Sequence, residues 1–156
     1  MGGASKQDNT FNVNGFRRKK KDENNVETTE YAPGLATAVS RNTAETFTYL
    51  MGHQMLGFET DGSFYYFLSD SLSTVRDVVS ELGTVLSSYE FSAYGQRTET
   101  NENGISSQKT YVGGLSVQDE VDDTGLMMMG HRFYEPQLGR FLNRDPIGHA
   151  GVMCDN

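Results

Sequence analysis

The stretch from Gly125 to Gly148, GLMMMGHRFYEPQLGRFLNRDPIG, decides the fold class of this chain. Aromatic and apolar residues alternate in it with turn-forming residues, a pattern that is typical of short strands broken by tight turns. Its densest part holds the runs Tyr134-Glu135-Pro136, Gly139-Arg140-Phe141 and Arg144-Asp145-Pro146-Ile147-Gly148. We therefore expect short β-strands in this stretch.

The composition extends this expectation to the rest of the chain. The 156 residues include 17 Gly, 8 Tyr and 9 Phe but only 3 Pro, which favours many short strands joined by glycine turns over a helical domain. Only 36% of the residues are apolar and 22% are charged, so a large closed core would be hard to build. We expect an all-β fold in which antiparallel hairpins form a thin, curved sheet.

Residues 46–68 contain the clearest hairpin. Asp61-Gly62 separates residues 57–60 from the aromatic run of residues 63–68. Asp-Gly tolerates the positive φ angles of a type I′ turn, whose twist matches that of paired strands. We expect this hairpin at the centre of the sheet.

Residues 69–97 allow two interpretations. Leu72, Val75, Val78, Val79 and Leu82 recur at helical spacing, and Asp70 or Ser71 could cap such a helix. The valines are stiff β-formers, however, and residues 84–91 alternate cleanly. We favour two strands joined near Glu81-Leu82-Gly83. Farther on, we expect a polar loop at residues 101–108 and a new strand at residues 110–114.

The wording of residues 124–148 closely resembles the RHS repeat-associated core domain, whose usual form runs TGLYYYGARYYDPxxGRFLxxDPIG. Residues 69–97 resemble a second segment of the same family, and residues 11–18 resemble a degenerate YD repeat. The three methionines at 127–129 replace the usual tyrosine tract. The core-motif positions are Gly125, Leu126, Gly130, Arg132, Tyr134, Pro136, Gly139, Arg140, Phe141, Arg144, Asp145, Pro146 and Gly148.

The resemblance implies the organisation of the chain and its function. Residues 1–10 are polar and contain glycine, which predicts a disordered tail. The resemblance implies degenerate YD-repeat hairpins at 11–109 and the core signature at 110–148, followed by a short tail at 149–156. Members of this family wind such hairpins into a hollow β-shell around a toxin, and the core segment plugs one end. The chain is thus expected to be a shell and plug fragment of a bacterial toxin-delivery system for intercellular competition, truncated before any toxin. A surface module that binds carbohydrate or a partner is a further alternative.

The resemblance also raises a catalytic alternative, a self-cleaving aspartyl peptidase centred on Asp145 with Arg144 beside it. Such chemistry needs two carboxylates that share one proton. Asp145-Pro146 is the only Asp-Pro pair among the 156 residues, so the second motif of the family is absent and we expect no enzyme activity. Asp145 would then pair with Arg140 or Arg144 in a structural turn.

Charge and composition limit the partners. The net charge of −8 argues against nucleic acid, although residues 17–21 form one basic run, RRKKK, which we interpret as a solvated strand or turn. The acidic cluster at residues 119–123 suggests calcium, but its spacing matches no EF-hand, and an exposed loop is favoured. With one cysteine, Cys154, and three scattered histidines, we expect no metal and no cofactor.

No apolar run is long enough to span a bilayer, and residues 1–10 lack the apolar segment of a signal peptide. The family resemblance implies a secreted or cell-surface protein. Its expected partners are the rest of an RHS shell and a toxin cargo, and unpaired sheet edges predict self-association.

Overall fold

Strand-forming segments separated by turn residues produce a chain that is almost entirely β. A computed structural model describes residues 8–12, 17–21, 27–31, 37–40, 45–102, 105, 107–115 and 117–144. Fourteen strands lie in these residues, with one 3-10 turn and one four-residue helix. The expected all-β, antiparallel fold is confirmed.

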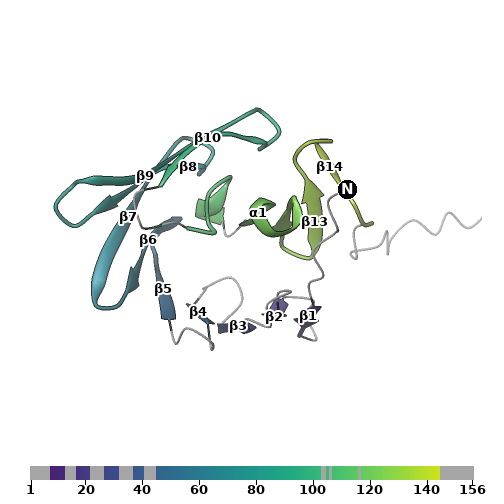
Figure 1. Cartoon of the computed structure of the whole chain (residues 1–156), viewed down its shortest axis with the longest axis horizontal. Helices are drawn as coiled ribbons and strands as arrows, with labels where there is room; N and C mark the ends of the chain where they lie inside the picture. Colours follow the sequence, from purple (N-terminus) through teal and green to yellow (C-terminus); the bar gives the residue numbers. More distant parts are fainter. Residues whose placement is uncertain are drawn as a thin grey trace, which may run out of the picture.

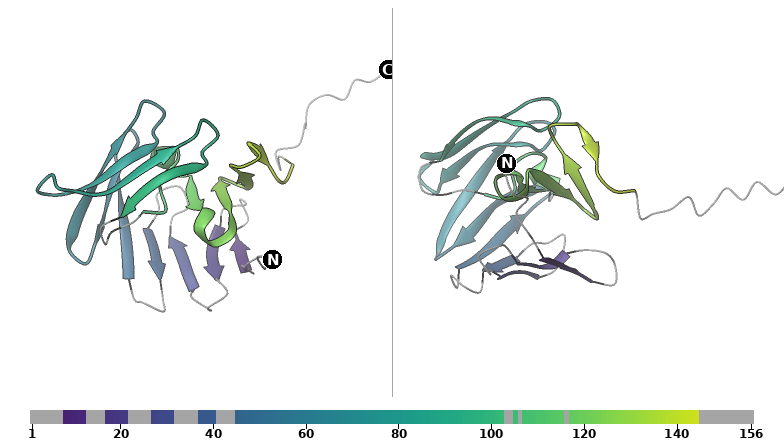
Figure 2. Two further views of the ribbon diagram at one scale, coloured as in Figure 1. Left: turned by 45° about the horizontal axis from the view of Figure 1, so that its top comes forward. Right: turned by 45° about the vertical axis from the view of Figure 1, so that its right-hand side comes forward.

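The first ten strands form one sheet in which the order in space equals the order in sequence, and each strand is antiparallel to the next. They are β1 (Asp8–Phe11), β2 (Arg17–Lys21), β3 (Glu27–Tyr31), β4 (Thr37–Ser40), β5 (Glu45–Met51), β6 (Met55–Thr60), β7 (Ser63–Ser69), β8 (Val75–Ser80), β9 (Val85–Phe91) and β10 (Arg97–Glu102). Figure 1 shows this sheet as an open arc, and Figure 2 shows its curvature from two other sides.

The Asp61-Gly62 hairpin is present as predicted. It joins β6 to β7, and both turn residues have positive φ angles, 49° at Asp61 and 76° at Gly62. The Glu59 carboxylate accepts a 2.8 Å hydrogen bond from the Gly62 amide. The two positive φ angles are those that the Asp-Gly pair predicted for this turn.

Residues 69–97 form two strands, and the helical interpretation is wrong. β8 and β9 pair through Val78 and Ser87, with Gly83 in the connecting turn at a φ of 78°. Val75 and Val78 are fully buried. Burial on one face of a sheet overrides the helical spacing, because branched side chains pack well on a pleated surface.

Three other expectations need correction. β1 begins at Asp8, inside the segment expected to be a disordered tail, while residues 1–7 lie outside the described residues. β10 continues to Glu102, inside the expected polar loop. The strand expected at residues 110–114 is a turn followed by the 3-10 turn η1 (Gly113–Leu115), whose consecutive glycines favour a tight turn over an extended strand.

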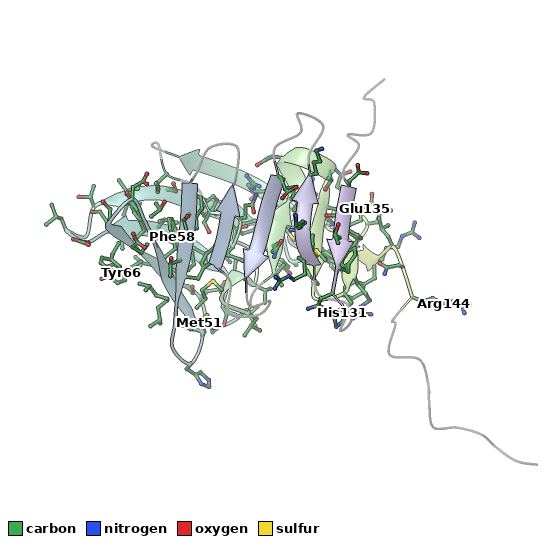
Figure 3. The ribbon with its side chains drawn as sticks, turned by 90° about the horizontal axis from the view of Figure 1, so that it is seen from below. Met51, Phe58, Tyr66, His131, Glu135 and Arg144 are labelled. Carbon is green, nitrogen blue, oxygen red and sulfur yellow. The ribbon has the colours of Figure 1, made fainter. Side chains whose placement is uncertain are left out.

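The core lies on the concave face of the arc. Phe58 is 1% exposed, and its ring meets those of Phe47, Tyr49, Tyr65 and Phe67 at centroid distances of 5.6, 6.0, 5.1 and 5.8 Å. The cluster also holds Met55, Val75, Val78 and Tyr89. Side chains alternate between the faces of a strand, so Tyr66, labelled with Phe58 in Figure 3, lies on the outer face and is 42% exposed.

Asp70 fixes the turn between β7 and β8. One carboxylate oxygen accepts the amides of Leu72 (2.9 Å) and Thr74 (3.0 Å), and the other pairs with Arg76 at 3.0 Å. Burial opposes ionisation, but the amide hydrogen bonds and the guanidinium outweigh it and hold the pKa of Asp70 below its usual range. The ionised carboxylate therefore stabilises the folded chain.

We predict that Asp70→Asn lowers the free energy of unfolding by about 1–2 kcal/mol at neutral pH. A depressed pKa gives stability that is present above the unfolded-state pKa and is lost as the pH falls through the folded-state pKa. The variant should thus lose less stability than the wild type between neutral and acid pH in urea titrations. Asp61→Asn, at an exposed turn that Asn also tolerates, is the matched control. Identical acid dependence of wild type and Asp70→Asn would contradict this assignment.

Candidate functional site

The segment after β10 returns across the concave side of the arc and builds a second, smaller sheet. Its elements are β11 (Gln118–Glu120), α1 (Val121–Thr124), β12 (Leu126–Met129), β13 (Arg132–Glu135) and β14 (Arg140–Phe141), and the strands lie in the order β11-β12-β13-β14. Figures 1 and 2 show α1 and β13 beside the hollow of the large sheet. The short strands predicted for the core signature are confirmed.

Three glycines of the core motif provide the turns between these strands. Gly125 ends α1 with a φ of 76°, and its amide donates to the Val121 carbonyl at 2.8 Å. Gly130 has a φ of 61° in the two-residue turn between β12 and β13, and Gly139 has a φ of 63° before β14. A side chain would be strained at each position, because L residues rarely adopt positive φ.

The motif therefore forms a folding unit of short strands and tight glycine turns in this chain. Strands β13 and β14 pair with each other, and Tyr134 lies opposite Phe141.

 The two rings meet edge to face at a centroid distance of 5.4 Å, and the Arg132 guanidinium lies 3.6 Å from the centroid of the Phe141 ring. Edge-to-face rings and a cation over a ring face are both attractive arrangements. Arg132, Tyr134 and Phe141 thus hold the two strands together.

Tyr134 also attaches the small sheet to the large one. Its hydroxyl donates to the Tyr94 carbonyl at 2.9 Å, in the turn between β9 and β10. A Cβ atom at Gly139 would lie 3.0 Å from the Tyr94 ring, so glycine allows this close approach. Burial raises the pKa of Tyr134 above its usual range, and the neighbouring phenols of Tyr111 and Tyr94 raise it further.

We predict that Tyr134→Phe removes the tyrosine that ionises late in an alkaline absorbance titration of the folded chain. The raised pKa means that the neutral phenol is favoured in the folded state. Its stabilising effect is complete below the unfolded-state pKa and is lost as the pH rises through the folded-state pKa. Loss of the hydroxyl should lower the free energy of unfolding by about 0.5–1.5 kcal/mol at neutral pH. Tyr66→Phe, on the outer face, is the control, and a titration curve that keeps its late phase in Tyr134→Phe would refute the assignment.

Charged residues also attach the small sheet to the large one, through contacts between β11 and β2. Arg17 and Lys20 are only 3% and 6% exposed, and Glu120 is 2% exposed. Glu120 lies 2.5 Å from the Arg17 guanidinium and 3.4 Å from the Lys20 ammonium. Arg17 also donates to the Gln118 side chain. The interpretation of the basic run as solvated is therefore wrong for Arg17 and Lys20, because they neutralise a buried carboxylate.

Asp119 forms a second charged contact, with β10. Its carboxylate accepts hydrogen bonds from Thr110 (2.6 Å) and Arg97 (3.1 Å), and Arg97 also reaches Asp122 at 3.0 Å. Asp119 is 6% exposed, whereas the Asp122 side chain is 80% exposed. The acidic cluster at residues 119–123 is thus not the exposed loop that we expected. Within the described residues, no group of three or more His, Cys, Asp or Glu side chains could hold a metal ion.

The residues of the catalytic alternative, Arg144 and Asp145, lie at the edge of what the structure describes. Arg144, labelled in Figure 3, is exposed at the last described position. Asp145, Pro146 and Gly148 lie outside the described residues, as do His149 and Cys154. The role expected for Asp145, including its pairing with Arg140 or Arg144, stays a prediction.

The core motif is recognisable in the sequence, but the residues that it contacts in the large sheet are not. Arg17, Arg97 and Tyr94 gave no signal of their own as contact residues, because their partners are distant in the sequence. Tyr94 and Gly95 do lie within residues 69–97, the second segment that resembles the family. Gly95 has a φ of 83°, and a Cβ atom there would lie 2.7 Å from the Tyr111 ring.

A curved antiparallel meander with a small sheet across its concave side defines a β-shell segment. Comparison with known families identifies it further: the family model described as Teneurin YD-shell matches residues 30–151. The chain belongs to the Teneurin YD-shell family. No helix among the described residues is long and apolar enough to cross a membrane.

Curated relatives include two bacterial proteins and one from a mosquito. The chain is 32% identical over 87 residues to Double-stranded DNA deaminase toxin A of Burkholderia cenocepacia, covering 56% of this chain and 6% of that protein. It is 27% identical over 110 residues to tRNA3(Ser)-specific nuclease WapA of Bacillus spizizenii, covering 70% and 5%. It is 29% identical over 93 residues to Salivary gland surface protein 1 of Aedes aegypti, covering 60% and 3%.

Solved structures share the fold at lower sequence identity. The Tc holotoxin pore of Photorhabdus luminescens contains a chain that matches with a TM-score of 0.71 and 19% identity, covering 95% of this chain and 8% of that chain. A crystal structure of TcdB2-TccC3 without the hypervariable C-terminal region matches with a TM-score of 0.68 and 19% identity, covering 93% and 8%. This chain therefore spans a small part of the length of each of these proteins.

Proposed function

We propose that this chain forms part of the wall and plug of a β-shell in a bacterial toxin system, where the shell encloses a polypeptide cargo. The observation that carries the proposal is the curved meander with an aromatic concave face, crossed by the small sheet. The names of two curated relatives support the toxin context, since one is a deaminase toxin and the other a nuclease. The solved toxin structures support the shell geometry.

The arrangement of the large sheet explains how such a wall could be extended. Strands β1 and β10 are the outermost strands of this sheet among the described residues. An outer strand offers backbone N–H and C=O groups to a further strand. The rest of a longer shell would pair there, and we propose that shell segments and an enclosed cargo are the partners of this chain. By its family resemblance, we also propose that the parent protein is secreted or displayed at the cell surface.

The proposal predicts that an enclosed cargo is shielded from added protease. The longest product of the gene that contains this chain would be purified and digested, with hollow particles sought by negative-stain electron microscopy. Phe58→Ala should increase cargo digestion, because truncating a buried Phe costs about 3–5 kcal/mol and weakens the wall. Tyr66→Ala, on the exposed face of the adjacent strand, should leave protection unchanged. Solid particles, or a cargo that is digested as fast as a denatured control, would contradict a shell.

We also propose that the chain has no peptidase activity. An aspartyl dyad requires two carboxylates that share a proton, and the 156 residues hold one Asp-Pro motif. Incubation of the purified chain should leave its intact mass unchanged, and Asp145→Asn should behave identically. A shorter species from the wild type that is absent from Asp145→Asn would show that Asp145 is catalytic.

A further inference from the structure

Two neighbouring carboxylates contact opposite ends of the ten-stranded sheet. Successive side chains of a strand point to opposite sides, and on β11 this directs Asp119 and Glu120 to different partners. Asp119 meets Arg97 at the start of β10, and Glu120 meets Arg17 and Lys20 on β2. β11 thus lies between the second and the tenth strand of the sheet.

The residues before β11 lie on the concave core. We call residues 107–115 and 117–120 the strap. The Val75 amide donates to the Thr110 carbonyl (2.9 Å), the Gly114 amide to the Ser73 carbonyl (2.9 Å), and the Val112 amide to the Thr74 hydroxyl (3.2 Å). Lys109 and Thr110 are buried. A Cβ atom at Gly113 would lie 3.4 Å from the Val75 side chain, which is fully buried, so the strap packs against this part of the core.

We propose that the strap is a charge-held latch, which opens and closes as one unit and couples the two ends of the large sheet. Buried ions are stable only while they remain paired. If the contacts of one carboxylate break, its charge is left uncompensated on β11. The other carboxylate is on the same strand, so its contacts are weakened as well. Because Asp119 and Glu120 are adjacent in one short strand, loss of either contact weakens the attachment of the whole strap. Opening exposes the concave core while the central hairpins stay folded. The latch is a property of this chain's own fold and does not depend on the proposed toxin context.

Native-state hydrogen exchange of the full 156-residue chain tests this inference. In the wild type, the amides of Val75, Val112 and Gly114 should exchange through one opening, with the same free energy and denaturant dependence, below that of global unfolding. The amides of Phe58 and Tyr65 should exchange only through global unfolding. Because this measurement uses no variant, it holds even if a variant fails to fold.

The variant Arg17→Gln tests the coupling between the ends. It should speed exchange of the distant Val75, Val112 and Gly114 amides by one common factor, on the order of 100-fold, as expected for breaking a buried ion pair. Arg97→Gln should act on the same set of amides. Asp122→Asn, which removes the exposed partner of Arg97, is the matched control and should change exchange by less than about fivefold.

Two results would overturn the proposal. If each arginine variant speeds exchange only at its own end, the two charged contacts are independent and there is no latch. If the amides of Phe58 and Tyr65 speed up by the same factor as those of the strap, the contacts serve global stability alone. Binding of a dye for exposed apolar surface should rise in Arg17→Gln and stay at the wild-type level in Asp122→Asn.

Discussion

Burial of two carboxylates on β11 constrains the whole chain. An ionised group in the interior is costly unless a counter-charge and hydrogen bonds compensate it. Arg17 and Lys20 supply that compensation for Glu120, and Arg97 and Thr110 supply it for Asp119. These cations belong to the second and tenth strands, so the sheet must curve enough for both strands to reach β11. Strand twist provides curvature in general, and the charged contacts select one arc.

The apolar interactions are consistent with the same arc. Aromatic side chains on the concave face pack around Phe58, and the concave face is where curvature brings neighbouring side chains closest. On the convex face the chain leaves Phe64, Tyr66 and Leu68 partly exposed on β7. The two faces of one strand therefore differ in exposure: the rings on the concave face are packed, and those on the convex face are accessible to solvent. The Tyr134 hydroxyl then attaches the small sheet to the turn at Tyr94.

The sequence predicted features that depend on neighbouring residues and missed those that depend on distant ones. Asp61-Gly62 and Glu81-Leu82-Gly83 mark turns because their backbone preferences are local, and both hairpins formed as expected. The strand expected at residues 110–114 failed because contacts with Ser73 and Thr74 favour a tight turn there. Burial of Arg17 could not be predicted, since its partners Gln118 and Glu120 lie about a hundred residues farther along. A basic run and an acidic run each look solvated until the fold brings them together.

The simple strand order of the large sheet has a consequence for how the molecule forms. Each of its strands pairs with the strand that precedes it in the chain, so the sheet has low contact order and each hairpin needs only a short loop to close. Such a sheet can grow strand by strand as the polypeptide leaves the ribosome. The contacts of β11 with β2 span most of the chain and can form only after all ten strands of the large sheet have been synthesised. Assembly of the wall is therefore expected to be fast and sequential, and fixing its final radius is expected to be the slow step.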